Sequence, residues 1–457
     1  MKRSRWARLF GLPAATALVL ASCGGGNDSA TGDAGGAQPG DGGRTADGGT
    51  GLNDSSLPIG NDAMVAPPSD GAVGSCLGST LLSDLGKDHL LVGGSMEDAT
   101  AAMAPFDARY IYISGGLFDG TAPCTSCTSN CTTGGTSCSG GACSWWGCWQ
   151  DTSQAPGQYP GEFVSTCSHA TPAQIPMITY YEILQGSGAN EGAGEVTAAN
   201  DATFMHRYFA DWRFLLQKIG QSQALFHIEP DFWGYAMQVN PDPTAIPAAV
   251  ASANSTDCGG MPNTIAGMGK CMIAMVRTYA PNAKVGLHAS AWATNIDVTA
   301  NTSPSLDVAG EATKLATFLT ACGAGSADFD VVETSDRDAG YYASIGRDTA
   351  WDATNTTLPD FHQDFAWATA LAEAVGKPNL WWQTPLGNAM QNNTTDHWQD
   401  NRVQYFFGHM NEMAAAHGVG VVYGAGATGQ TTPESDGGYF VSEAKAYFTA
   451  GGQALCE

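Results

Sequence analysis

Charged residues are scarce in this chain, and basic residues are the scarcest. Of 457 residues only 14% are charged, and 19 Lys and Arg stand against 44 Asp and Glu, which gives a formal net charge of −25. The chain has no basic stripe that would neutralise phosphates, so the composition excludes the usual nucleic-acid binders. The same deficit excludes charge-driven binding to anionic lipid. We therefore expect no nucleic-acid partner.

The chain also lacks an apolar run long enough to span a membrane. Its N-terminal apolar stretch, Phe10–Leu20, is interrupted by glycine and proline and is shorter than the roughly 20 residues that a spanning helix needs. Basic residues precede this stretch, and it ends in Leu20-Ala21-Ser22-Cys23. This order is typical of an export signal and resembles the bacterial lipobox, in which cleavage precedes lipidation of the cysteine. An ordinary signal peptide with an unrelated cysteine is the alternative.

Residues 24–75 lack aromatic side chains and carry one basic residue, Arg44. Because this stretch is rich in Gly and Asp, it cannot bury apolar surface and should be flexible. We interpret 1–22 as a lipoprotein signal peptide, 23–75 as lipidated Cys23 with its tether, and 76–457 as the functional domain. This predicts a monomer in the bacterial cell envelope, as an outer-membrane lipoprotein or at the cell surface, whose membrane contact is the lipid on Cys23.

Cysteine, by contrast, is plentiful, with 13 residues in the chain. If one is lipidated, an even number remains, and in an exported protein this predicts a disulfide framework. Several crowd into a Gly/Ser/Thr-rich segment, which we interpret as an insertion at about 121–170. Zinc is the alternative, because Cys124 and Cys127 have ligand-like spacing, but no clean second pair follows.

Two further cysteine pairs have suggestive positions. Cys76 and Cys456 flank the domain and are placed to staple its ends. Cys258 and Cys271 are close enough in sequence to close a local loop. Because connectivity does not follow from sequence, these pairings are expectations only.

Short apolar runs and helical patterns alternate along the domain. The expected strands are Leu90–Ser95, Arg109–Ser114, Met177–Ile183, Leu225–Asp231, Lys284–Ser290, Asp330–Ser335, Asn379–Pro385 and Gly418–Gly424. Helical patterns cover Thr203–Gly220, Met268–Tyr279, Asp307–Ala321, Phe361–Val375, His397–His417 and Tyr439–Thr449. Eight strands alternating with helices predict a (β/α)₈ barrel of the TIM type, with the Cys-rich insertion after the second strand. An open doubly wound sheet is the alternative, but the first strand is not followed by a phosphate-binding glycine pattern.

Carboxylates collect where the expected strands end, which is where barrels carry their chemistry. Glu182 and Glu333 end the third and sixth strands. By strand alternation, His227, Glu229 and Asp231 share one face of the fourth strand, and we expect them to point into the barrel mouth.

Two carboxylates on opposite sides of a scissile bond are what glycoside hydrolysis requires. We assign the acid–base work to Glu229 or Asp231, with Glu182 or Glu333 as the partner. The alternative for Glu229 is a buried structural carboxylate paired with His227 or His288. Aromatic rings that stack on sugars, together with polar side chains around them, complete the expected site. The predicted substrate-binding residues are His227, His288, Trp233, Trp292, Trp382, Gln383, Tyr181 and Trp146.

The stretch Ile228-Glu229-Pro230-Asp231 resembles the Glu-Pro-Asp motif of glycoside hydrolase family 6, the cellulases with a modified barrel. The later segments 286–292, 332–335 and 381–387 are similar to segments of that family in the same order. The resemblance implies a carbohydrate-active barrel in which Asp231 is the general acid. The family's Asp-rich loop before the motif is replaced by Tyr180-Tyr181-Glu182, and Gln383 and Asn388 stand near the position of its later carboxylate.

Three hypotheses follow. The first is an exported glycoside hydrolase acting on a polysaccharide or oligosaccharide without a cofactor. The second is a non-catalytic surface lipoprotein that binds glycans on the same scaffold. The third is a metal-dependent barrel hydrolase, because His227, Glu229, His288 and Glu333 form a mixed nitrogen and oxygen set that divalent metals accept. Since no standard metal motif is present, we predict no metal.

Overall fold

The computed structural model describes residues 76–114, 117, 157–347 and 349–455. The predicted signal peptide, the predicted lipidation site Cys23, the predicted tether, Trp146 and most of the predicted Cys-rich insertion lie outside the described residues. Among the described helices, none combines the length and the apolar character that crossing a membrane requires.

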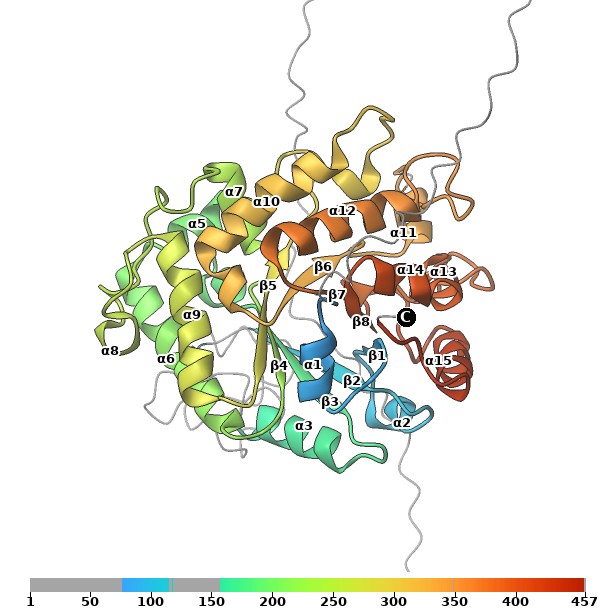
Figure 1. The fold of residues 1–457 in the computed structure, drawn as a ribbon, viewed down its shortest axis with the longest axis horizontal. Coiled ribbons are helices and arrows are strands. Elements are labelled where there is room, and N and C mark those ends of the chain that lie inside the picture. The colour runs from blue at the N-terminus through green and yellow to red at the C-terminus, as the bar shows by residue number, and fades with distance from the viewer. Residues whose placement is uncertain (1–75, 115–116, 118–156, 348, 456–457) are drawn as a thin grey trace, which may run out of the picture. The chain divides into compact units, whose positions relative to one another are not determined.

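In the described part of the chain, eight parallel strands close into a barrel in chain order, which confirms the predicted fold (Figure 1). The strands are β1 (Leu91–Gly94), β2 (Ala108–Ile113), β3 (Ile175–Tyr180), β4 (Leu225–Ile228), β5 (Lys284–Ala289), β6 (Phe329–Glu333), β7 (Asn379–Thr384) and β8 (Gly418–Tyr423). Closure comes from pairing of β1 with β8, with Leu91 opposite Gly420. The barrel leaves no open sheet edge.

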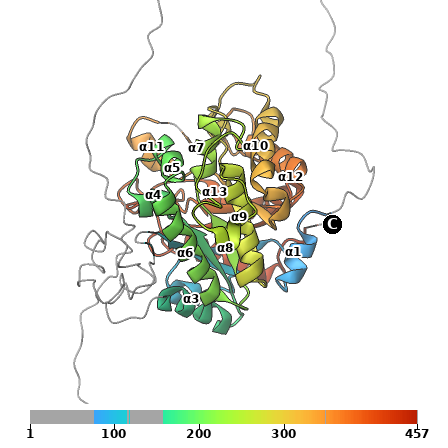
Figure 2. The same ribbon diagram turned by 90° about the vertical axis from the view of Figure 1, so that its left-hand side faces the viewer.

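Helices surround the strands (Figures 1 and 2). They are α1 (Ser79–Asp84), α2 (Asp98–Ala101), α3 (Gln158–His169), α4 (Ile183–Ser187), α5 (Ala193–Ala198), α6 (Ala202–Ile219), α7 (Phe232–Val239), α8 (Ser255–Cys258), α9 (Ile265–Tyr279), α10 (Val308–Cys322), α11 (Ala339–Ser344), α12 (Phe361–Val375), α13 (Arg402–Gly408), α14 (Met410–Ala415) and α15 (Tyr439–Thr449). The predicted helix at 397–417 is wrong as a single element, since α13 and α14 are separated at His409.

Helix α6 shows why the helical patterns were readable. The Asp201 carboxylate accepts hydrogen bonds from the backbone N–H groups of Thr203 and Phe204 and so caps its start. Gly220, at a φ of 55°, ends it. The apolar side chains at helical spacing between these points, from Met205 to Ile219, are buried against the barrel.

The core has two parts that follow from strand alternation. One lies between strands and helices, and the other fills the barrel interior together with leucines of α1. Trp381 belongs to the first part and Trp382 to the second, as expected for neighbours on opposite faces of a strand. Trp382 thus fills the centre of the barrel.

The cysteines follow the expectation in part. Cys258 and Cys271 form a disulfide bond, as their spacing suggested. Cys76 is disulfide-bonded too, but the expected partner Cys456 lies outside the described residues. Cys167 and Cys322 are free and buried, so the expectation that all cysteines other than Cys23 pair is wrong. Buried thiols of this kind act as small apolar core residues.

Candidate active site

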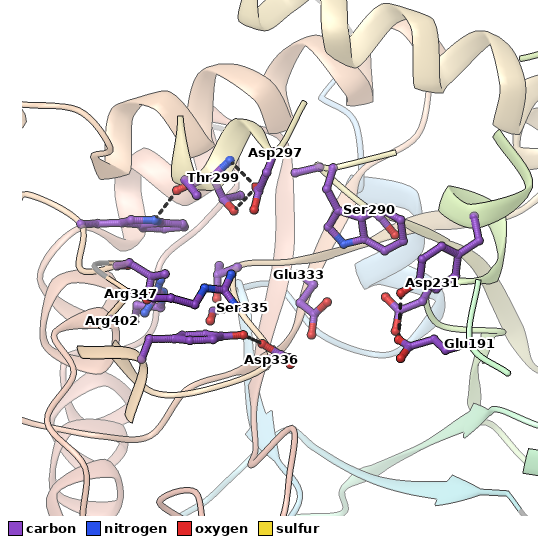
Figure 3. A pocket seen from close by; sticks show the side chains of 18 residues that line it. Glu191, Asp231, Ser290, Asp297, Thr299, Glu333, Ser335, Asp336, Arg347 and Arg402 are labelled. Atoms are coloured by element: carbon purple, nitrogen blue, oxygen red, sulfur yellow. Dashed lines mark hydrogen bonds between the residues drawn. The ribbon is translucent and has the colours of Figure 1, made fainter. Parts of the chain in front are cut away.

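A cavity of about 230 Å³ lies at the carboxyl ends of the central strands. Its walls come from residues that follow β3, β4 and β5, from the end of β6 and the residues after it, from the loop that precedes α12 and from Arg402 of α13. Figure 3 shows Glu191 and Asp231 on one side, Arg347 and Arg402 on the other, and Glu333 between them. This is the end of the barrel at which enzymes of this architecture carry their active sites.

Asp231 and Glu333 form the chemical centre of the cavity. One oxygen of each carboxylate and one ring nitrogen of His288 all lie within 4.8 Å of one another. Burial, with the negative charges of Glu191 and Asp336, raises the pKa of Asp231 to about 7. Burial and the neighbouring Asp231 hold the pKa of Glu333 well above its usual range. Two carboxyl groups this close cannot both ionise easily, so the pair retains a proton near neutral pH.

The two carboxyl groups differ in their hydrogen bonds. Gln383 Nε2 donates to Glu333 Oε1 at 2.8 Å, and Gln383 in turn accepts from the Tyr112 hydroxyl. Among the described residues, no hydrogen bond reaches the Asp231 carboxylate, and its closest ring nitrogen, His288 Nε2, is 3.8 Å away. This N–H donor favours a negative charge on Glu333 and so opposes the burial and the neighbouring charges that raise its pKa.

Gln383 was predicted to bind substrate, but it is buried behind Glu333 and does not line the cavity. Its backbone has a φ of 54°, which non-glycine residues seldom adopt. Gly426 makes room for it, because a Cβ at this position would lie 2.6 Å from Gln383 Nε2. The local backbone therefore fixes the donor that holds Glu333.

Aromatic rings form opposite parts of the wall. Tyr235 and Trp292 pack with ring centroids 4.7 Å apart, and the Tyr235 hydroxyl donates to Glu191 at 2.8 Å. Trp292 fits there because Gly234 has no side chain: a Cβ would lie 2.8 Å from its ring. On the other side, the Arg402 guanidinium covers the Trp351 ring at 4.4 Å. The cavity thus combines acids with aromatic side chains.

Glu229 does not line this cavity. Its side chain is fully buried and accepts hydrogen bonds from the backbone N–H groups of Glu182 at 3.1 Å and Ile183 at 3.3 Å. The Tyr208 hydroxyl of α6 donates to it at 2.8 Å. Burial raises the pKa of Glu229 to about 8. Glu229 thus connects the end of β4 to the start of α4. This is the buried structural role that the sequence analysis gave as the alternative, but its partners are backbone N–H groups and Tyr208 instead of His227 or His288.

The prediction that His227, Glu229 and Asp231 share a face is wrong for a local reason. Strand β4 ends at Ile228, and the backbone then turns through left-handed conformations, with φ values of 50° at Glu229 and 65° at Asp231. Strand alternation does not hold beyond that point. Glu229 consequently faces the helical layer, while Asp231 faces the cavity.

The other predicted residues fall into two groups. Trp292 lines the cavity as expected. Glu182, His227, His288, Trp233, Trp382 and Tyr181 do not line it, and all but Tyr181 are buried. Trp233 packs in the helical layer and donates its ring N–H to the Ile228 carbonyl at 3.0 Å. The buried side chains of this group belong to the interior of the protein and not to the cavity wall.

Sequence reasoning missed several wall residues. Glu191, Asp297, Tyr235, Tyr342, Trp351 and Arg402 all line the cavity. Glu191, Asp297 and Trp351 lie in loops that follow expected strands. These loops form the C-terminal face of a barrel, where active sites lie, so their position after a strand could have marked the three residues as candidates.

No family model and no curated protein matches the chain. Among solved structures, an endoglucanase of Mycobacterium tuberculosis is 14% identical, with a TM-score of 0.26, over 49% of this chain and 55% of its own. An endoglucanase of Humicola insolens is 15% identical, with a TM-score of 0.31, over 53% and 64%. The carboxyl transferase domain of Rhizobium etli pyruvate carboxylase is 11% identical, with a TM-score of 0.35, over 84% and 52%. This chain thus covers less than two thirds of each. Similarity at this level carries no functional argument, so the function is argued from the site.

Proposed function

We propose that this protein is a glycoside hydrolase in which Asp231 and Glu333 perform acid–base catalysis on a polysaccharide or oligosaccharide. The observation that carries the proposal is the close carboxyl pair at the carboxyl ends of β4 and β6, where one oxygen of each lies within 4.8 Å of the other. Both groups have raised pKa values, so the pair keeps a proton near neutral pH, and the hydrogen bond from Gln383 distinguishes its two members.

The roles follow from the hydrogen bonds. Asp231, whose carboxyl group accepts no hydrogen bond within 3.5 Å among the described residues, is the protonated acid and gives its proton to the oxygen of the leaving sugar. Glu333, held by Gln383 at 2.8 Å, is the ionised partner that acts on the sugar or on a water molecule. Trp292, which is partly exposed, offers a ring face for the apolar side of a sugar ring.

The test is release of reducing sugars by the full chain from plant, fungal and bacterial polysaccharides. Asp231→Asn and Glu333→Gln are each expected to lose at least about 1,000-fold in kcat. Glu373→Gln is the matched control, because its side chain on α12 is 66% exposed and outside the cavity. Asp231→Asn should retain more activity on aryl glycosides, whose leaving groups need no proton, than Glu333→Gln does. Binding of a polysaccharide without any hydrolysis would instead support the glycan-binding alternative.

We also propose export and anchoring through lipidated Cys23. The order of the N-terminal segments and the Cys258–Cys271 disulfide bond support an oxidising location outside the cytoplasm. Replacing Cys23 with serine should move the protein from the membrane fraction to the soluble one, and an unchanged membrane fraction would contradict the anchor.

A further inference from the structure

Three buried polar residues form a line across neighbouring strands beneath the cavity. Thr179 Oγ1 of β3 lies 3.2 Å from His227 Nδ1 of β4, and His227 Nε2 lies 3.0 Å from His288 Nδ1 of β5. Each of the three residues is fully buried. The line ends at His288 Nε2, which has no hydrogen-bond partner among the residues that the structure describes and lies 3.8 Å from Asp231 Oδ1. The sequence assigned both histidines to substrate, but neither lines the cavity.

Both imidazoles are neutral in this environment. Burial lowers the pKa of His288 to about 3, and burial together with His288 lowers the pKa of His227 well below its usual range. The Trp382 ring packs edge-on against both, with centroids 4.5 Å from His227 and 5.7 Å from His288. A neutral imidazole has one N–H donor and one bare nitrogen, so the line has only two consistent arrangements of its protons.

The Thr179 hydroxyl distinguishes the two arrangements. Among the described residues, His227 Nδ1 is the one acceptor that the structure gives it. If the hydroxyl donates to Nδ1, then His227 donates from Nε2 to His288 Nδ1, and the proton of His288 lies on Nε2. In the opposite arrangement the hydroxyl hydrogen of Thr179 would be buried without an acceptor and His288 Nε2 would be a buried bare nitrogen, whereas in the first arrangement the hydrogen left unbonded, Nε2–H of His288, faces the Asp231 carboxyl at 3.8 Å.

We infer that the Thr179–His227–His288 line fixes His288 with its Nε2–H directed at Asp231 Oδ1, so that His288 is a positioning residue for the catalytic acid. The inference rests on the proposed function. With Oδ1 facing an N–H donor, the acidic proton of Asp231 lies on Oδ2. In the acid step the bond from Oδ2 to this proton breaks and a bond from the proton to the leaving oxygen forms. His288 keeps its own proton and stabilises the carboxylate that results.

The same geometry weighs against a metal at this point. In the described part of the chain, one group of side chains could hold a metal ion, because it brings three ligand-type atoms together; it consists of Asp231, His288 and Glu333. Ligation by His288 would need a bare Nε2, and that requires the opposite proton arrangement along the whole line. A proton on His288 Nε2 and a metal bound to that nitrogen therefore exclude each other.

The direct test is nitrogen NMR of the full chain labelled at histidine, which distinguishes a protonated from a bare Nε2. The expected result is a proton on His288 Nε2 and a bare Nδ1, unchanged by added Zn²⁺ or EDTA. A bare Nε2, or an Nε2 signal that shifts with stoichiometric Zn²⁺, would overturn the inference. This measurement needs no substrate, so it stands even if no hydrolysis is found and the proposed function fails.

The kinetic test compares two replacements of His288. The amide nitrogen of glutamine reaches the place of Nε2, whereas that of asparagine reaches only the place of Nδ1. His288→Asn should lower kcat about 10- to 100-fold with little change in KM, and His288→Gln should stay within about threefold of the wild type. Equal losses in both variants, or losses in KM alone, would contradict the positioning role.

A pH profile adds a readout that a merely structural histidine would not move. Loss of the N–H donor should raise the pKa of Asp231 further, and the basic limb of kcat should move upward by about one unit in His288→Asn. Thr179→Val should reproduce part of this shift and Thr179→Ser should not. The titratable groups that face Asp231 remain in place in every variant; they are Glu191, Glu195, Glu333, Asp336, Tyr112, Tyr181 and Tyr235. An unmoved basic limb would contradict the inference.

Discussion

Gln383 Nε2 on β7 donates a 2.8 Å hydrogen bond to Glu333 Oε1 on the neighbouring strand β6. The donor is itself held by the Tyr112 hydroxyl, and its backbone has a φ of 54°. Strain of this kind persists where the surrounding structure enforces it, which is common at functional sites. The bond gives Glu333 a fixed direction and favours its charged form.

Replacing Gln383 with leucine should therefore weaken catalysis. Without the donor, the pKa of Glu333 should rise further above its already raised position, and kcat should fall about 10- to 100-fold. Steady-state kinetics would measure this. Gln223→Leu serves as control, because Gln223 is exposed and bonds to the Asp84 carbonyl away from the cavity. Full activity in Gln383→Leu would show that Glu333 needs no such support.

Asp231→Asn should stabilise the protein at alkaline pH while it abolishes activity. The pKa of Asp231 rises from 3.8 to about 7 in the folded state, so the folded state binds this proton more tightly than the unfolded state. That stabilisation is complete below about 3.8 and is lost as pH rises through about 7. Because asparagine has no charge to bury, the unfolding free energy of the variant should exceed that of the wild type by about 1–2 kcal/mol at pH 8 and equal it at pH 4. Urea unfolding at both pH values would check the difference, and a gain at pH 4 alone would contradict the sign.

Glu229→Gln should damage stability more than chemistry. The Glu229 carboxyl accepts from two backbone N–H groups and from the Tyr208 hydroxyl; above its pKa of about 8 both oxygens are acceptors, and a glutamine amide would turn one of them into a buried donor. We expect a loss of about 1–3 kcal/mol in unfolding free energy, with kcat of the folded fraction within about threefold. A stable but inactive variant would return Glu229 to the list of catalytic candidates.

Two tryptophans that follow the neighbouring strands β4 and β5 should respond differently to truncation. Trp292 lines the cavity, so Trp292→Ala should raise KM about tenfold and leave stability nearly unchanged. Trp233 is fully buried, so Trp233→Ala should lower the unfolding free energy by about 3–5 kcal/mol. Substrate titrations and thermal unfolding of both variants provide the comparison. Equal changes in KM and in unfolding free energy in the two variants would contradict the placement of Trp292 in the cavity wall and Trp233 in the core.

Much of the fold was readable from local patterns. Apolar runs gave each strand to within a few residues, and capping residues such as Asp201 and Gly220 set the limits of α6. The even number of cysteines was less reliable, because Cys167 and Cys322 are buried in the core as free thiols. Composition counts residues of a type but does not tell which of them come close enough to bond.

The sequence by itself determined the barrel and the end of it where acids and aromatic rings gather, because these depend on periodicity within short segments and on the order of strands. Only the tertiary structure decided that Asp231 and Glu333 meet while Glu229 turns away. Left-handed backbone at Glu229 and Asp231 rotates adjacent side chains to different sides, and the distance between β4 and β6 depends on closure of the whole barrel. Neither the turn nor the closure leaves a periodic signal in the chain, so the acid pair emerges only when the strands are assembled.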